Sequence, residues 1–249
     1  MTALALHGIG HAYLGRSVLD GIDLDVGTGE IVALVGPSGC GKSTLVHIAA
    51  GLIDARAGRV ERGYLRHAMI FQEPCLMPWA TAAGNIDYVL GLAGIPRRQR
   101  QSRVPEVADQ VALDAEDLLK YPVELSGGMK QRVTIARAFA VQPDFIFFDE
   151  PFTALDVALR RRMQDLVIDI CSTSRVSGLF ITHDLHEAAR IAHRIAVVDT
   201  RGRGILGERT LTGDPRSRAD ATVFRWVQHA LATDPLFHHV HDVDERNTA

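Results

Sequence analysis

The segment Gly36-Pro37-Ser38-Gly39-Cys40-Gly41-Lys42-Ser43-Thr44 has glycines, a lysine and hydroxyls at the spacing G-x-x-x-x-G-K-[ST]. The glycines let backbone N–H groups turn inward around phosphate oxygens. Lys42 can reach the β- and γ-phosphates, and the Ser43 hydroxyl can ligate Mg²⁺. Cys40 stands at a position that the pattern leaves free, so we interpret it as a small filler and not as a reactive thiol. The segment predicts a nucleotide phosphate site.

A second anion site is predicted by Leu125-Ser126-Gly127-Gly128-Met129-Lys130-Gln131-Arg132. Ser126 suits a helix N-cap, and the two glycines after it expose backbone N–H groups ahead of basic side chains. Two such helix starts are difficult to place on a single nucleotide. The second site is therefore expected to serve a nucleotide that another copy of the chain holds.

Two carboxylates end the apolar run Phe145-Ile146-Phe147-Phe148, namely Asp149 and Glu150. Asp149 can hold the shell of a metal ion while Glu150 takes a proton from water. The alternative is a strand that simply ends in polar residues. This alternative is the weaker one, because an aspartate buried beside apolar residues needs a partner.

Three further side chains are candidates for contacts with a metal ion, a phosphate or a nucleotide base. Gln72 and His183 each follow a predicted strand, where an amide can meet a metal or water and an imidazole can reach a γ-phosphate. Tyr13 can stack on a purine base, but a half-buried strand tyrosine is the commoner use of such a residue.

The elements that must position these residues are predicted from periodicity and turn residues. Strands are expected within 3–35, with 31–35 as a buried strand, and at 66–71, 145–149, 178–182 and 195–199; helices are expected at 44–51, 88–93, 104–111, 130–141, 159–171, 185–192 and 221–232. Ala57-Gly58 is expected to be a turn and Arg97-Arg98-Gln99-Arg100 a basic linker. The alternation predicts an α/β core with an N-terminal antiparallel β subdomain and an inserted helical subdomain. The 36–44 motif makes this core one of the P-loop NTPase (RecA-like) type.

We predict one nucleotide-binding domain over 1–249, with a catalytic core (1–75 and 143–215), a helical subdomain (76–142) and a C-terminal tail (216–249). With 47% hydrophobic residues the chain can bury a core, and its net charge of −3 does not favour nucleic acid as a partner. Three cysteines without a C-x-x-C pair, together with the lack of a signal peptide or an 18-residue apolar run, predict a cytoplasmic protein. The tail residues His238, His239, His241, Asp242 and Asp244 can bind metal, but we favour a disordered end.

In this order the motifs resemble those of the ATP-binding subunits of ATP-binding-cassette (ABC) importers, over about residues 3–215. The matching segments are 36–44 (Walker A), Gln72 (Q-loop), 125–131 (signature motif), 145–149 (Walker B), Ala154-Leu155-Asp156 (D-loop) and His183 (switch histidine). The resemblance implies that Tyr13 stacks on adenine, which reverses the interpretation above. It also implies ATP and Mg²⁺ as cofactors and two copies facing head to tail. Ser126, Gly127 and Gly128 of one copy would then close over the γ-phosphate at Lys42 of the other.

The resemblance implies hydrolysis of ATP by Glu150, with Lys42, Gln72 and His183 assisting, and with Ser43, Asp149 and Gln72 around Mg²⁺. It implies two transmembrane permease subunits and a solute-binding protein as partners, with the ATPase on the inner face of the membrane. The run Phe71 to Trp79 is most similar to the nitrate/sulfonate/taurine branch, and Pro78 and Trp79 lie where the family contacts its permease. The segment 59–66 is shorter than is usual in the family, which puts the strand geometry there in doubt.

Two other classes of function remain as alternatives. A non-transport ABC ATPase acting on nucleic acid or ribosomes would typically carry two cassettes, a coiled-coil insertion or zinc motifs, and the sequence has none of these. A nucleotide-binding regulator without turnover is disfavoured because both Glu150 and His183 are present.

Overall fold

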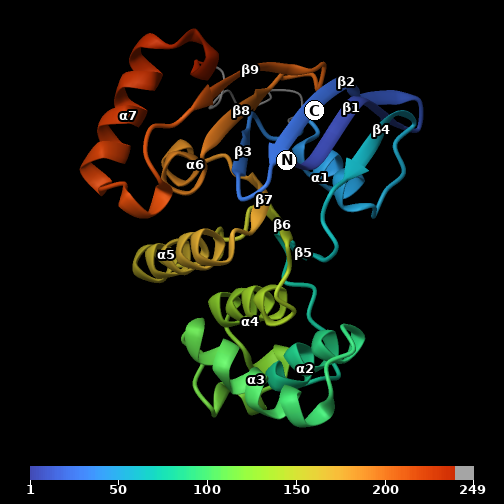
Figure 1. Cartoon of the computed structure of the whole chain (residues 1–249), viewed down its shortest axis with the longest axis vertical. Coiled ribbons are helices and arrows are strands. Elements are labelled where there is room, and N and C mark those ends of the chain that lie inside the picture. Colours follow the sequence, from blue (N-terminus) through green and yellow to red (C-terminus); the bar gives the residue numbers. More distant parts are fainter. Residues whose placement is uncertain (239–249) are drawn as a thin grey trace. The chain divides into compact units, whose positions relative to one another are not determined.

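The computed structural model describes residues 1–238, and the chain forms two compact units (Figure 1). The first unit comprises Met1–Leu65 and the chain from Ile168 onward, and the second comprises Arg66–Val167. In the part of the chain that is described, no helix has the length and apolar character needed to cross a membrane. Each unit is described below by itself.

An antiparallel sheet in the first unit has the strand order β2-β1-β4. Its strands are β1 (Thr2–Tyr13), β2 (Arg16–Gly27) and β4 (Ala57–Arg62). The antiparallel pairing predicted for the N-terminal strands is confirmed by the register, in which Leu6 faces Leu24. The turn predicted at Ala57-Gly58 is wrong, because β4 begins there. Gly58 has φ +84°, and an added Cβ would lie 2.3 Å from the carbonyl oxygen of His7, so this glycine permits a close backbone approach and does not end the strand. The shortened segment still pairs with β1 as far as Arg62.

The other sheet strands of the first unit run in the order β7-β3-β8-β9. They are β3 (Ile31–Val35), β7 (Ser177–Ile181), β8 (Arg194–Val198) and β9 (Ile205–Thr210). The first three are parallel neighbours, and β3 and β7 are buried at every residue, as their apolar runs predicted. The sequence analysis did not predict β9. This strand pairs antiparallel with β8 and is mostly exposed, so it lacks the apolar run that identified the others.

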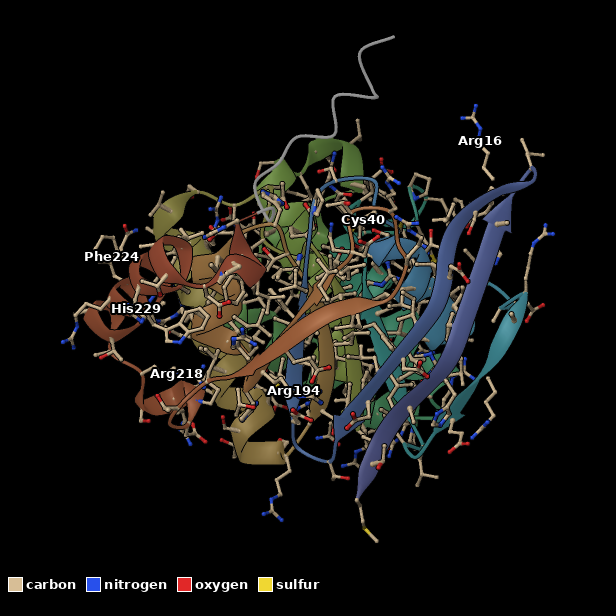
Figure 2. All side chains as sticks on the ribbon, turned by 90° about the horizontal axis from the view of Figure 1, so that it is seen from above. Arg16, Cys40, Arg194, Arg218, Phe224 and His229 are labelled. Carbon is tan, nitrogen blue, oxygen red and sulfur yellow. The ribbon has the colours of Figure 1, made fainter. Side chains whose placement is uncertain are left out.

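The helices of the first unit are α1 (Lys42–Ala50), α6 (Leu185–Ile191) and α7 (Asp220–Thr233), with short 3-10 turns at Pro215–Ser217 and Pro235–Phe237. Each predicted helix is present, although α1 begins at Lys42 and not at Thr44. Arg218 binds the end of α6, because its guanidinium donates to the carbonyls of Ala189 and Ala192 at 2.9 and 2.5 Å. Phe224 and His229 are exposed on α7 (Figure 2).

The second unit has one parallel strand pair, β5 (His67–Ile70) with β6 (Phe145–Asp149). Its helices are α2 (Ala82–Leu92), α3 (Arg97–Gln110) and α4 (Gly127–Ala140), with 3-10 turns at Asp117–Leu119 and Pro122–Glu124, and α5 (Val157–Ser174) begins in it. The basic linker predicted at Arg97–Arg100 is wrong, because these residues form the first turn of α3. Arg100 pairs with Asp87 of α2 at 2.9 Å, and this non-local contact favours a helix where charge alone suggested a linker.

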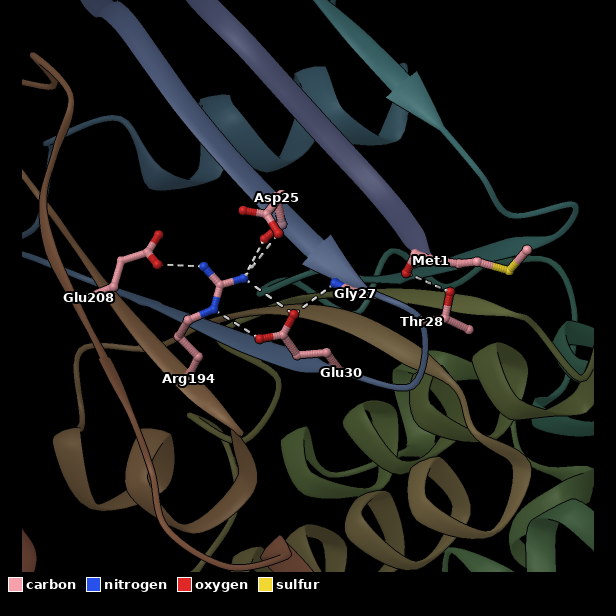
Figure 3. A network of polar contacts seen from close by, with 7 residues as sticks. All are labelled: Met1, Asp25, Gly27, Thr28, Glu30, Arg194 and Glu208. Atoms are coloured by element: carbon pink, nitrogen blue, oxygen red, sulfur yellow. Dashed lines mark hydrogen bonds and ion pairs between the residues drawn. The ribbon is translucent and has the colours of Figure 1, made fainter.

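One arginine joins four segments of the first unit (Figure 3). The Arg194 side chain is 12% exposed and donates to Glu30 at 2.9 Å, to Glu208 at 2.5 Å and to the carbonyl of Asp25 at 2.7 Å. Burial alone would raise the pKa of Glu30, but hydrogen bonds from Arg194 and the Gly27 N–H outweigh it and hold that pKa below its ordinary value. The same carboxylates raise the pKa of Arg194. The pairs hold β8 against β9 and the start of β3.

We expect Arg194→Met to lower the free energy of unfolding by roughly 2 kcal/mol at pH 7, because it leaves the partly buried Glu30 without its partner. The folded-state pKa of Glu30 is depressed, so this contribution is present above its unfolded-state pKa and is lost as the pH falls through the folded value. Urea titrations of both proteins at pH 7 and in acid measure the difference. Arg59→Met, at an exposed ion pair with Glu61, is the control, with a much smaller expected loss. Equal losses of unfolding free energy in the two variants would contradict the stabilising role of Arg194.

Candidate functional site

The predicted phosphate loop connects the carboxyl end of β3 to α1. Gly41 is the residue before the helix, with φ +96°, and no side chain caps the N–H groups of the first turn. A helix N-terminus of this kind presents backbone N–H groups and positive potential to an anion. The backbone turn has no room for a side chain, because a Cβ at Gly41 would lie 2.8 Å from Cδ2 of Leu19. The glycine is thus required both by its positive φ and by the packing of the loop against β2.

Lys42 is buried, with 6% of its surface exposed, and its ammonium group is enclosed by its own loop. Nζ donates to the carbonyl oxygens of Gly36 and Pro37, both at 2.7 Å. Within residues 1–238, its third proton has only the Cys40 sulfur, at 3.7 Å, which is a weak acceptor. A phosphate oxygen is a far stronger acceptor, so the arrangement leaves one proton of a desolvated cation for an anionic ligand.

Cys40 lies inside the loop and is 2% exposed (Figure 2). Burial raises the pKa of its thiol, and the nearby Lys42 offsets only part of this effect. Its sulfur would lie 3.2 Å from a Cβ at Gly36, so it fills the space beneath the start of the loop. This geometry agrees with the interpretation of Cys40 as a small filler.

His183 follows β7 at the same sheet edge as the phosphate loop. β3 and β7 are parallel, with Leu34 facing Ile181, so the residues after both strands emerge at one edge. The turn that carries His183 is fixed on both sides of it. Thr182 donates to Glu187 at 2.9 Å, and Asp184 caps α6 by accepting from the N–H of His186 at 2.7 Å. The imidazole itself is exposed, which leaves it accessible to a ligand.

Tyr13 ends β1 at the tip of the β1–β2 hairpin. The turn is made by Leu14 and Gly15, both at positive φ, and Arg16 projects from its tip (Figure 2). The tyrosine ring is 46% exposed and meets the His11 ring edge-on at a centroid distance of 4.7 Å. One part of the ring is therefore supported by a neighbour while another part faces solvent, as a stacking platform requires.

A cleft of about 390 Å³ lies beside the phosphate loop. It is lined by the start of β2, the loop residue Gly39 and the β8–β9 turn; the residues are Ser17, Val18, Asp20, Gly39, Thr200, Arg201 and Arg203. The turn is held against β2, since the N–H of Asp20 donates to the carbonyl of Gly202 at 2.9 Å. Arg201, Arg203 and Asp20 are the charged residues of this lining, and Arg203 pairs with Asp199 at 3.9 Å.

The second unit brings Gln72 and Glu150 together. β5 and β6 are parallel, so the residues after them emerge at one edge, and Nε2 of Gln72 lies 3.5 Å from Oε2 of Glu150. Asp149, the last residue of β6, is 4% exposed. An amide, a buried carboxylate and a half-buried carboxylate therefore lie at one strand edge, as the sequence predicted for a metal and water site.

Glu150 adopts a strained backbone conformation. Its φ is +46°, a region that costs a non-glycine residue on the order of 1 kcal/mol. Thr153 stabilises this turn, since its hydroxyl lies 3.2 Å from the carbonyl oxygen of Glu150 and 3.4 Å from Oε2. The sequence analysis did not single out Thr153. A threonine three residues after the second carboxylate is its only sequence signal.

The glycine-rich helix start is the N-terminus of α4. Ser126 caps it as predicted, with Oγ accepting from the N–H of Met129 at 3.2 Å, and a Cβ at Gly127 would meet nothing within 4 Å. Gln131 has a different environment from the exposed glycines. It is 1% exposed, and its Nε2 donates to the carbonyl of Pro151 at 2.8 Å, which ties α4 to the turn after Glu150.

Asp156 caps α5, because its Oδ1 accepts from the N–H of Leu159 at 2.9 Å. The candidate residues thus fall into two groups. Tyr13, the loop 36–44 and His183 belong to the first unit; Gln72, 126–131, Asp149, Glu150 and Asp156 belong to the second. Of the predicted tail ligands, His239, His241, Asp242 and Asp244 lie outside the described residues, and His238 directly follows the last 3-10 turn.

Comparison with known proteins gives consistent similarities. The sequence profile described as ABC transporter matches residues 19–153. An aliphatic sulfonates import ATP-binding protein of Pseudomonas syringae pv. syringae is 41% identical over 88% of this chain and 91% of its own length. One from Nocardia farcinica is 39% identical over 92% and 91%. Among solved structures, the dimeric ATP-binding cassette MJ0796, in a post-hydrolysis state with ADP and Pi, is similar with a TM-score of 0.77 at 28% identity, covering 84% of this chain and 99% of that one.

We expect a thiol reagent at pH 8 to label Cys75 quickly and Cys40 and Cys171 slowly. Cys75 is exposed, whereas burial raises the pKa of Cys40 and raises that of Cys171 to about 12, so both buried thiols are protonated as well as shielded. Mass spectrometry of the labelled native protein measures each rate. A Cys75→Ser variant should lose the fast phase, and all three thiols should react in denaturant. Fast labelling of native Cys40 would contradict its assignment as a buried filler.

Proposed function

This chain belongs to the ABC transporter family, and from that membership we propose that it is the ATP-hydrolysing subunit of an importer. The observation that carries the proposal is the phosphate loop with its enclosed Lys42 ammonium, which has one proton left for an anionic ligand. The names of its relatives support the importer reading, since they are called import ATP-binding proteins at about 40% identity over most of the chain.

ATP is the nucleotide, with adenine on Tyr13 and the phosphates in the loop 36–44. Lys42 and the loop N–H groups stabilise the negative charge on the phosphates. Mg²⁺, when bound, adds positive charge to the same phosphates. The hydroxyl of Ser43, the carboxylate of Asp149 and the amide oxygen of Gln72 would hold it, and such hard oxygen donors suit this ion.

Glu150 orients and deprotonates the attacking water, and His183 contacts the γ-phosphate. The positive φ of Glu150 and its contact with Thr153 support this role, because backbone strain held in place by neighbouring contacts is common where a side chain must be aimed. The amide of Gln72 beside the same carboxylate keeps a polar environment for water.

Two copies work together, with Ser126, Gly127 and Gly128 of one closing over the γ-phosphate bound by the other. The N-terminus of α4 supports this reading, because Ser126 and Gly127 are exposed and a Cβ at Gly127 would meet nothing within 4 Å. Asp156, which caps α5 after β6, helps to shape the surface on which the two copies pair. The related cassette MJ0796 is a dimer, which also favours this arrangement.

The membrane partners are two permease subunits, with a solute-binding protein in the assembled system, so this subunit works on the cytoplasmic face. Trp79 and Pro78 contact the permease; Trp79 is 76% exposed, which leaves its indole accessible to a partner. The names of the relatives favour aliphatic sulfonates among the nitrate, sulfonate and taurine anions. The solute itself touches other subunits, so its identity is set outside this chain.

We expect Glu150→Gln to reduce ATP turnover at least about 100-fold while leaving ATP binding and pairing of the two copies intact, because the amide cannot accept the proton of water. Phosphate release measures turnover, and nucleotide titration measures ATP binding. Lys42→Ala is the contrasting variant and should weaken nucleotide binding itself. Turnover at the wild-type rate in Glu150→Gln would remove Glu150 from its proposed role.

We expect multi-span membrane proteins to co-purify with the tagged chain from a native membrane extract and to stimulate its ATPase activity. Mass spectrometry identifies the captured proteins, and ATPase assays with and without them measure the stimulation. Lys42→Ala provides the matched control, because it should still be captured but show no stimulated turnover. Capture of ribosomal or nucleic-acid proteins alone would favour the non-transport alternative.

A further inference from the structure

Trp79 stands in a short turn between β5 and α2. The turn runs from Met77 to Thr81, and the N–H of Ala80 donates to the carbonyl of Met77 at 3.2 Å. The indole is 76% exposed although it is a large apolar side chain. Hydrogen bonds from α2 hold both ends of this turn.

Asn85, in the first turns of α2, binds this turn at both ends. Its Oδ1 accepts from the N–H of Met77 at 2.8 Å, and its Nδ2 lies 3.2 Å from the carbonyl oxygen of the same residue. Nδ2 also lies 3.1 Å from the carbonyl oxygen of Ala80 and 3.0 Å from that of Thr81. Asn85 is 0% exposed, and its side chain lies within hydrogen-bond distance of four backbone groups of the turn, with the two protons of Nδ2 shared among three carbonyl oxygens.

Only Pro78 and Trp79 in this turn have no hydrogen bond to Asn85. Proline restricts its own backbone, so the residue beside it has little freedom once both ends of the turn are bound. The helix start is also fixed, since Thr81 caps α2 at 3.1 Å and the N–H of Ala82 donates to the carbonyl of Lys120 at 2.8 Å. Trp79 therefore projects from a braced turn.

Asparagine is a poor choice for helix stability alone. It is less favourable than leucine or alanine within a helix, and a buried amide is tolerated only when it is hydrogen-bonded. A turn that had only to connect β5 to α2 could cover its tryptophan with apolar neighbours. The combination of a fully buried amide and an exposed indole instead indicates a turn whose shape is maintained for contact with another molecule.

We propose that Asn85 is a positioning residue that holds the 77–81 turn so that Trp79 is presented in one orientation to the membrane partner. The proposal rests on the function proposed above, in which Trp79 contacts the permease. A preformed turn avoids the loss of loop and side-chain freedom that an unbraced Trp79 would suffer on binding. Asn85 thus acts through Trp79 and has no contact with nucleotide in this role.

Fluorescence of Trp79 tests the positioning directly. The chain has two tryptophans, so Trp226→Phe leaves Trp79 as the single reporter. In that background we expect Asn85→Ala to lower the amplitude of the slow component of the Trp79 anisotropy decay at least twofold. Val107→Ala, a buried truncation on α3, is the matched control for lost stability and should leave the decay unchanged. An unchanged decay in folded Asn85→Ala, or the same loss in Val107→Ala, would overturn the proposal.

Hydrogen exchange of the unaltered protein tests the same idea if Asn85→Ala does not fold. The Met77 N–H is bound only by Asn85, so we expect it to exchange at least about 100-fold more slowly than the same amide in an unstructured chain. Exchange of Met77 at the rate of an unstructured chain would overturn the proposal.

Binding to the membrane subunits captured with the tagged chain, in detergent micelles, tests the consequence. We expect Trp79→Ala to weaken binding, and Asn85→Ala to weaken it roughly five- to tenfold through the lost preorganisation. If Asn85→Ala loosens Trp79 but binding is unchanged, the positioning role is overturned. If Trp79→Ala binds as well as the wild type, it is the proposed permease contact that fails, whereas the fluorescence and exchange results still report on the bracing of the turn.

Discussion

A buried ammonium group has to be stabilised by hydrogen-bond acceptors around it, and the structure of the phosphate site depends on which acceptors surround Lys42. The carbonyls of Gly36 and Pro37 turn inward to accept its protons. A backbone that curves this tightly needs Gly41 at positive φ, and it is supported by β2, whose Leu19 occupies the space a side chain at Gly41 would take. The shape of the loop, its packing and its remaining proton donor are therefore all linked to the hydrogen bonds that stabilise the Lys42 ammonium group.

Backbone strain occurs at candidate sites in both units. Within residues 1–238, six non-glycine residues have positive φ, and three of them flank or form candidate contacts: Leu14 beside Tyr13, Cys75 between Gln72 and Trp79, and Glu150 itself. Such conformations persist only where neighbouring contacts outweigh their cost. At Glu150 the neighbour is Thr153, and at the Cys75 carbonyl it is Arg137, at 2.9 Å. Three of the six strained positions therefore lie at or beside candidate contacts, while Ala112, Gln142 and Arg175 do not.

Motif spacing and apolar runs predicted the parts of the fold that are encoded locally. The buried strands, the helix after Lys42 and the Ser126 cap are of this kind, because each depends on neighbours in the sequence. The predictions failed where distant contacts decide. Gly58 looked like a turn but sits in β4 against β1, and Arg97–Arg100 looked like a linker but forms helix with Arg100 paired to Asp87. Asn85 and Arg194 could not be singled out, since only their three-dimensional partners distinguish them from ordinary polar residues.

The phosphate loop and the Trp79 turn differ in how they depend on the rest of the chain. The phosphate loop is shaped by contacts that are distant in sequence, such as Leu19 against Gly41 and the Val198 carbonyl behind Gly36. The Trp79 turn is braced by Asn85, only eight residues after Met77. Local hydrogen bonds of this kind re-form without long loop closure, whereas the loop needs an intact sheet. Partial opening of the first unit's sheet therefore impairs nucleotide binding without itself loosening the Trp79 turn.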